Sequence, residues 1–140
     1  MKLTQPTAGG TANYILTFLR SYATSMRVLV CGGRRYHDEA ALNRWLDRLH
    51  KQRGPFKTLI SGNAPGADRL AEAWAAKRGV AVQTFPANWK SHGRAAGPKR
   101  NAEMLKIGKP DLIIAFPGGT GTAHMVTIAR QAGIDVKEVS

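Results

Sequence analysis

Three glycine-bearing turns are the parts of the sequence best suited to holding a phosphate group. Their sequences are GGRRYHDE at 32–39, GNAPGADR at 62–69 and PGGTGTAH at 117–124, and each opens a helical pattern. The N-terminus of a helix offers unpaired N–H groups and a partial positive charge, and glycine lets an anion approach the backbone. At any one of these turns, the glycines are explained by the need for a tight turn with positive φ alone. Three such turns on one sheet edge favour a phosphate-binding site.

Polar side chains near these turns supply further candidates for ligand contacts. Arg34, Lys99 and Arg100 can neutralise phosphate, arginine through a bidentate fork. Asp68 either caps its helix, which is slightly favoured, or binds a ribose hydroxyl, and Asn101 can read a base or ribose edge. The predicted ligand-binding residues are Gly32, Gly33, Arg34, Gly62, Gly66, Asp68, Lys99, Arg100, Asn101, Pro117, Gly118, Gly119, Thr120, Gly121 and Thr122.

Several motifs of cofactor and catalytic sites are absent from the sequence. No G-x-x-x-x-G-K-[ST] occurs, which argues against a P-loop ATPase, and GGRRYH does not match the G-x-G-x-x-G of dinucleotide sites. The four histidines lack the paired spacing of a zinc site, and no serine lies in a G-x-S-x-G turn. Cys31 lies at the end of an apolar run, so we interpret it as a small buried residue and not as a nucleophile. We therefore expect neither a metal ion nor a cofactor.

Alternating strand and helix patterns position the three turns. Residues 86–98 are predicted to form a long polar loop, in which Trp89 either stacks on a base or packs the loop down. The alternation predicts an α/β protein, a single Rossmann-like three-layer domain with a mostly parallel sheet over residues 27–140. Residues 1–26 are interpreted as an N-terminal appendage with a run compatible with a short helix. Predicted strands are 27–31, 58–61, 80–85, 111–116 and 135–139, and predicted helices are 38–53, 67–78, 99–107 and 122–132.

Composition and charge limit the partners. The chain has 140 residues and a formal net charge of +12, and between Lys77 and Lys109 the only acidic residue is Glu103. Such an excess attracts the phosphates of nucleotides or nucleic acids. One cysteine excludes an internal disulfide, and no apolar run approaches the roughly 18 to 20 residues of a membrane span. We expect a cytoplasmic protein without membrane association, and a homo-oligomer.

The sequence blocks around the turns also resemble a known family. The blocks RVLVCGGRRYHD, ISGNAPGADRLAEAWA, FPANWKSHGRAAGPKRNAEML and LIIAFPGGTGTAHMV are similar, in this order, to those of the YspA, YpsA-related branch of the SLOG superfamily. PGGTGT resembles the P-G-G-x-G-T signature of the superfamily, which includes the lonely-guy phosphoribohydrolases and DNA-processing protein A. The resemblance implies a Rossmann-like sheet that binds a nucleotide or a nucleotide-derived ligand.

One departure from that resemblance concerns catalysis. The lonely-guy signature continues to a catalytic glutamate, and the corresponding position here is Met125, while Arg100 is the counterpart of their arginine. A thioether neither accepts a proton nor stabilises an oxocarbenium ion. The leading hypothesis is therefore a protein that binds a nucleotide-derived phosphorylated ligand, with nucleotide hydrolase or sensor activity left open. The alternative is a single-stranded nucleic-acid-binding module.

Overall fold

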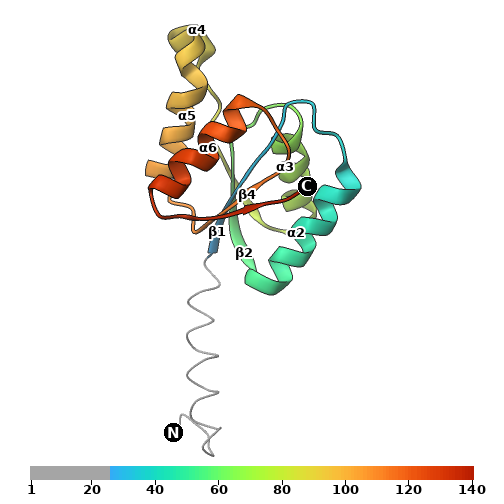
Figure 1. Cartoon of the computed structure of the whole chain (residues 1–140). Coiled ribbons are helices and arrows are strands. Elements are labelled where there is room, and N and C mark those ends of the chain that lie inside the picture. Colours follow the sequence, from blue (N-terminus) through green and yellow to red (C-terminus); the bar gives the residue numbers. More distant parts are fainter. Residues whose placement is uncertain (1–25) are drawn as a thin grey trace, which may run out of the picture.

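A five-stranded parallel sheet is the centre of the fold over residues 26–140, the part of the chain that the computed structural model describes (Figure 1). All four neighbouring strand pairs are parallel, and the strand order is β3-β2-β1-β4-β5. This confirms the predicted α/β class and Rossmann-like architecture. The predicted appendage lies outside the described residues, apart from Met26, which begins the first strand. The strands are β1 (Met26–Cys31), β2 (Phe56–Ser61), β3 (Ala81–Thr84), β4 (Leu112–Ala115) and β5 (Asp135–Glu138).

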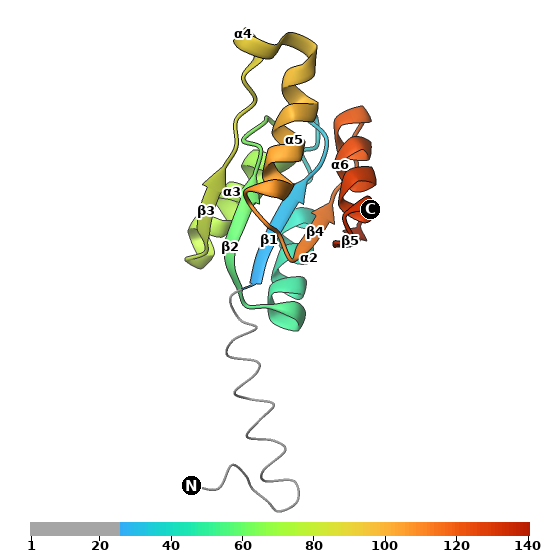
Figure 2. The ribbon, with the colours of Figure 1, turned by 90° about the vertical axis from the view of Figure 1, so that its left-hand side faces the viewer.

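Helices cover both faces of the sheet, which gives the three predicted layers (Figure 2). Helices α2 (Glu39–Arg53) and α3 (Ala67–Arg78) pack on one face, and α5 (Ala96–Lys106) and α6 (Thr120–Gln131) pack on the other. Successive residues of β1 join opposite layers, since Val28 contributes to the α2–α3 core and Leu29 to the α5–α6 core. Burial on both faces explains the continuous apolar runs of the central strands.

The segment between β3 and β4 corrects the sequence-based prediction. Instead of a loop over residues 86–98, the chain forms α4 (Trp89–His92), a 3₁₀ turn (Gly93–Ala95) and then α5, which begins at Ala96. Asn88 starts α4 by accepting a hydrogen bond from the N–H of Ser91, at 3.1 Å. Pro98 lies in the first turn of α5, where its missing N–H costs no helical hydrogen bond. Together α4 and the start of α5 project beyond the C-terminal ends of the strands (Figure 2).

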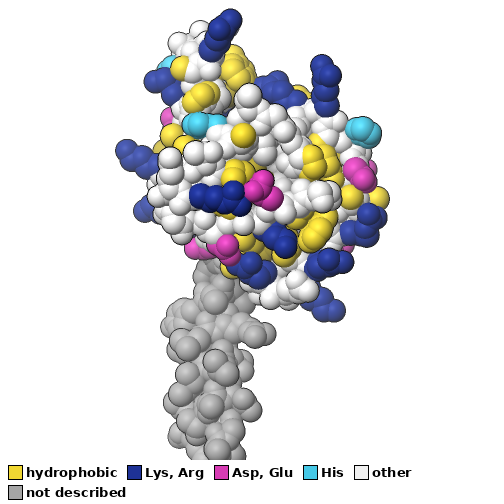
Figure 3. Space-filling model, in the orientation of Figure 1, with side chains coloured by type: hydrophobic (Ala, Val, Ile, Leu, Met, Phe, Trp, Pro, Cys, Tyr) yellow, Lys and Arg dark blue, Asp and Glu magenta, His cyan; other side chains and the backbone are white. Residues whose placement is uncertain are grey.

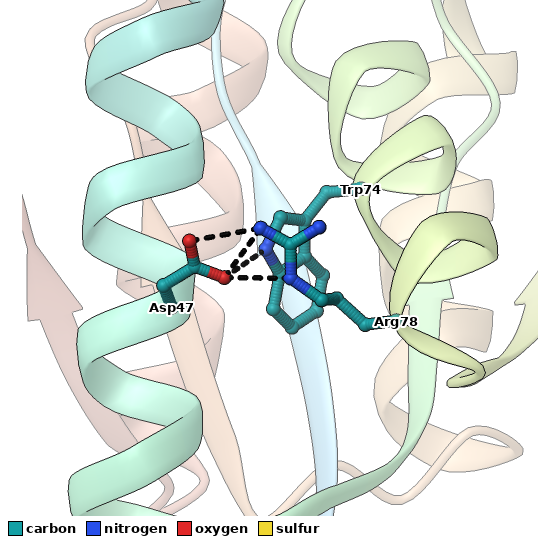
Figure 4. Close-up of polar contacts among 3 residues, drawn as sticks. All are labelled: Asp47, Trp74 and Arg78. Atoms are coloured by element: carbon teal, nitrogen blue, oxygen red, sulfur yellow. Dashed lines mark hydrogen bonds and ion pairs between the residues drawn. The ribbon is translucent and has the colours of Figure 1, made fainter.

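A polar contact joins α2 to α3, the helices that follow the first two glycine-bearing turns. Asp47 of α2 accepts a hydrogen bond from the indole N–H of Trp74, at 2.9 Å, and two from the guanidinium of Arg78, also at 2.9 Å (Figure 4). Both donors, Trp74 and Arg78, belong to α3, and the Trp74 ring is buried in the core. The contact thus fixes one helix against the other across their outer surface. Within residues 26–140, no helix combines the length and apolarity that crossing a membrane requires.

Candidate functional site

The three glycine-bearing turns meet at Gly33. Its N–H donates to the carbonyl of Pro117 at 2.8 Å, and its own carbonyl accepts from the N–H of Ala67 at 3.1 Å and of Tyr36 at 3.2 Å. One residue thus connects the turn after β1 to the turn after β4 and to the start of α3. This junction lies between β1 and β4, where the strand order reverses. In open parallel sheets, that reversal is where ligands bind beyond the strand ends.

Close backbone approach requires glycine at two of the joints between turns. A Cβ at Gly66, whose φ is +83°, would lie 2.6 Å from the carbonyl carbon of Arg34. A Cβ at Gly118 would lie 2.7 Å from the nitrogen of Gly33 and would overlap the hydroxyl of Thr122. These glycines allow the three turns to pack on one another.

The start of α6, in contrast, is open to approach from outside. A Cβ at Gly119 or Gly121 would meet nothing within 4 Å. Gly119 is the N-cap, and within residues 26–140 no side chain accepts a hydrogen bond from the first N–H groups of the helix. The helix begins at Thr120, two residues before the predicted position. Its first turn is therefore free to bind an anion.

Two consecutive residues of α5 bridge the second and third turns. Arg100 Nη1 donates to the carbonyl of Gly62 at 2.8 Å, and Asn101 Nδ2 donates to the carbonyl of Gly121 at 3.2 Å. Arg100 Nε also donates to Asn101 Oδ1 at 3.1 Å, so the two side chains hold each other in place. Nη2 of Arg100 makes no hydrogen bond within residues 26–140, which leaves that side of the guanidinium available to a ligand.

Asp68 is enclosed by the second turn and does not cap its helix. It is 6% exposed and accepts a hydrogen bond from the N–H of Ala64 at 3.1 Å. The N-cap of α3 is Gly66, and no side chain caps that helix, so the predicted capping role is wrong. Burial raises the pKa of Asp68 to about 6, against the opposing effects of the Ala64 N–H and the charge of Arg100. The Asp68 side chain thus accepts a hydrogen bond from inside the turn, at the cost of burying an ionisable group.

Seven of the predicted ligand-binding residues line one of two hollows at this edge of the sheet. The larger, about 370 Å³, lies on the β5 side of α6, where its arginine is paired with Glu138. The smaller, about 210 Å³, has no carboxylate in its lining and contains three arginines, so it suits an anionic ligand better. The larger includes Pro117, Gly118, Gly119, Thr122 and Arg130, and the smaller includes Arg34, Gly62, Asn63, Arg69, Trp89 and Arg100.

The other eight predicted residues line neither hollow. Lys99 is exposed on α5 and lies in neither hollow. Of the others, Gly32, Gly33 and Gly66 lie in the turns, Asp68 is the enclosed carboxyl group and Asn101 bridges α5 to α6. Thr120 and Gly121 are the first two residues of α6.

Three polar neighbours of the site were missed by reasoning from the sequence. Asn63 and Arg69 line the smaller hollow, and both belong to the second glycine-bearing turn, whose position was the available signal. His124 Nδ1 lies 3.1 Å from Asn101 Nδ2. No sequence signal pairs these two residues, because they come from different helices.

Met125 and Cys31, neither of which was predicted to be catalytic, are both buried in the core. Met125 packs in the α5–α6 core, which confirms its interpretation as a packing residue. Cys31 lies in the same core, and burial raises the pKa of its thiol to about 12, so it is not a nucleophile at neutral pH. In the described part of the chain, no three His, Cys, Asp or Glu side chains cluster in a way that would hold a metal ion.

A parallel sheet with glycine-bearing turns joined at its switch point defines a Rossmann-like protein. Comparison with known proteins gives the family. A family model described as YspA, cpYpsA-related SLOG family matches residues 26–92. The gene 61 protein of Mycobacterium phage D29 is 38% identical over 119 residues, which cover 79% of this chain and 93% of that protein. The chain belongs to the YspA, cpYpsA-related SLOG family.

Two solved structures of DNA processing protein A share the fold. The protein from Streptococcus pneumoniae matches with a TM-score of 0.66 and 16% identity, over 82% of this chain and 50% of that chain. The protein from Helicobacter pylori, which binds single-stranded DNA, matches with a TM-score of 0.57 and 15% identity, over 84% and 66%. This chain therefore spans half of the pneumococcal protein's chain. At these identities the likeness establishes the fold alone.

Proposed function

We propose that this protein binds a phosphorylated, nucleotide-derived ligand at the C-terminal edge of its sheet. The junction at Gly33 carries the proposal, because it gathers the open start of α6 and the turn bound by Arg100 at the topological switch point. The free N–H groups of a helix start and the fork of an arginine both complement phosphate. Membership of the SLOG family supports the same ligand class.

The proposed activity is binding without the lonely-guy mechanism of base release. The position of the catalytic glutamate is taken by Met125, whose side chain is buried in the core and cannot contact a ribose. A carboxylate at this position would also lose its hydration inside an apolar cluster. The geometry therefore supports recognition of a nucleotide more strongly than cleavage of its glycosidic bond.

Gly119→Val tests where the phosphate binds. A Cβ at this position meets nothing within 4 Å, and φ is −102°, so the variant is expected to fold, with a small loss of stability because valine is a poorer N-cap than glycine. Its branched side chain fills the space in front of α6. We expect the affinity for nucleoside monophosphates to fall by at least about ten-fold, an effect of about 1.4 kcal/mol. The measurement is isothermal titration calorimetry with the adenosine, cytidine, guanosine and uridine monophosphates.

Ala132→Val is the matched control, since it adds the same branched side chain at the exposed, opposite end of α6. Circular dichroism and the melting temperature verify that both variants are folded. Unchanged nucleotide affinity in folded Gly119→Val contradicts the proposed phosphate position.

Single-stranded nucleic acid is the second candidate ligand, and the basic surface of the α4–α5 projection favours it. Lys90, Arg94 and Lys99 are all exposed there. Figure 3 shows Lys and Arg side chains on this projection and around much of the outline of the face in view. The fold is shared with a DNA processing protein A that binds single-stranded DNA. The salt dependence of binding separates the two candidates, because each phosphate contacted makes binding more sensitive to salt.

A further inference from the structure

Trp89 is an exposed aromatic side chain at the smaller hollow. It is 49% exposed, whereas Trp74 in the core is 1% exposed. Arg34 and α5 both lie close to its ring. The guanidinium carbon of Arg34 lies 5.4 Å from its ring centroid, and a Cβ added to Gly97 of α5 would lie 3.5 Å from its Cη2 atom. Of the large apolar side chains exposed in the described residues, Trp89 is the one that lines a hollow.

The charges around this ring are all positive. Arg34, Arg69 and Arg100 line the hollow, and its lining contains no carboxylate. Two carboxylates lie close to the second turn without lining the hollow: Asp68 is buried next to Gly62, and Glu72 accepts a hydrogen bond from the Ser61 hydroxyl at 2.6 Å. An exposed aromatic ring surrounded by arginines provides a stacking surface together with neutralisation of negative charge, which is the chemistry of a nucleobase attached to phosphate.

The size and place of the hollow show which part of such a ligand it fits. Its volume of about 210 Å³ is below the roughly 300 Å³ at which pockets for whole ligands begin. Arg100 lines the hollow, and the next residue, Asn101, binds the carbonyl of Gly121 at the start of α6. Two consecutive residues of α5 therefore contact the hollow and the start of α6.

We infer that this hollow binds the base of a free nucleoside phosphate, stacked on Trp89, while the phosphate extends past Arg100 to the start of α6. The inference rests on the proposed function and adds to it the base-binding position. A cation–π contact at an exposed site is weaker than the stacking of a base on an aromatic ring. The base therefore displaces the guanidinium of Arg34 from the ring, and that guanidinium turns to the phosphate.

Trp45 offers a matched control. Its ring also lies beneath cations, with the guanidinium carbon of Arg48 at 5.1 Å and the ammonium of Lys137 at 5.6 Å from its centroid. It packs against the α2–α3 core and lines neither hollow. Replacing Trp45 thus removes an aromatic ring with cation–π contacts away from the proposed site.

The experiment compares Trp89→Ala, Trp89→Phe and Trp45→Ala, with the four nucleoside monophosphates and ribose 5-phosphate as calorimetric probes. We expect Trp89→Ala to bind the nucleotides at least about five-fold more weakly, because it loses the stacking surface. Trp89→Phe, which keeps an aromatic ring, is expected to restore most of the affinity. Ribose 5-phosphate, which has no base, is expected to bind wild type and Trp89→Ala alike, and Trp45→Ala to bind as wild type does.

The outcomes separate this inference from the proposed function. If Gly119→Val loses nucleotide binding and Trp89→Ala does not, the base position is wrong and the phosphate position stands. Equal losses of nucleotide and ribose 5-phosphate in Trp89→Ala, or equal effects of Trp89→Ala and Trp45→Ala, also overturn the base position. Trp89-dependent binding of oligothymidylate without binding of the mononucleotides overturns the assignment to a free nucleotide. Absence of binding of any of these phosphorylated probes by the wild type overturns both proposals.

Discussion

At the scale of single residues, Asp68 shows how folding changes the chemistry of one carboxyl group. Enclosure by the second turn raises its pKa from 3.8 to about 6, because burial disfavours the charged form more than the Ala64 N–H and Arg100 favour it. The folded pKa thus lies above the unfolded one. The stability that this shift contributes is fully present below about pH 3.8 and is lost as the pH rises through about 6.

Asp68→Asn is expected to remove this pH dependence. The amide oxygen can still accept the hydrogen bond from Ala64, but the side chain no longer ionises. A shift of about two pKa units corresponds to about 3 kcal/mol, so the free energy of unfolding of the variant is expected to rise relative to the wild type by up to that amount from pH 4 to pH 7. Urea unfolding at pH 4, 5, 6 and 7 measures it, with the exposed Glu103→Gln as control. Parallel pH profiles for Asp68→Asn and wild type count against the buried, titrating carboxylate.

At the scale of elements, the contact between α2 and α3 combines two interactions that contribute unequally to stability, an exposed ion pair and the hydrogen bond of a buried indole. The pair of Asp47 with Arg78 is largely exposed, and such pairs contribute little to stability because water and salt screen the two charges. The indole N–H of Trp74 belongs to a buried ring, and leaving such a donor without a partner costs about 1 to 3 kcal/mol. Hydrogen bonds from Arg78 and Trp74 also lower the pKa of Asp47, with Arg78 the larger cause.

We therefore expect Asp47→Ala to destabilise the domain more than Arg78→Ala does. Asp47→Ala removes both the exposed pair and the acceptor of the buried indole. Arg78→Ala removes the exposed pair and a cation–π contact with Trp74 at 5.7 Å, but it leaves the acceptor of the indole in place. Asp47→Asn, which keeps an acceptor oxygen for Trp74, is expected to resemble Arg78→Ala. Urea-induced unfolding at pH 7 gives the three free energies. Equal losses in Asp47→Ala and Arg78→Ala show that the indole hydrogen bond contributes nothing.

At the scale of the whole molecule, the net charge of +12 attracts any phosphate, so affinity alone does not separate the two candidate ligands. Salt dependence does. Binding of a single-stranded nucleic acid has a log-log slope of about −0.7 for each phosphate contacted. A mononucleotide contacts the protein through one phosphate and is expected to show a shallow slope.

We expect nucleoside monophosphates to bind with that shallow slope, and the triple variant Lys90→Ala, Arg94→Ala and Lys99→Ala to leave it unchanged. These three residues are exposed on the α4–α5 projection and line neither hollow. Fluorescence titrations between 50 and 300 mM NaCl measure the slope. A steep slope for an oligothymidylate, reduced by about two in the triple variant, favours the nucleic-acid candidate instead.

Local patterns were enough to predict most of the fold. Both ends of α3 were predicted, because an apolar stripe at helical spacing lies between a glycine turn and Gly79. The parallel sheet followed from continuous apolar runs alternating with helices, and with it the placement of three glycine-bearing turns at one edge. The start of α5 was missed because Gly97 and Pro98 are typical of a break, although proline fits the first turn of a helix.

The sequence by itself determined the fold class, the sheet edge that carries the turns and the loss of the lonely-guy glutamate at Met125, because periodicity, turn chemistry and motif spacing are local properties of the chain. The tertiary structure alone decided which side chains meet there. Arg100 reaches Gly62 across 38 positions, and Arg34 lies over Trp89, because strand order and helix packing bring distant segments together. Burial of Asp68 and exposure of Trp89 were decided in the same way, since both depend on what other segments cover.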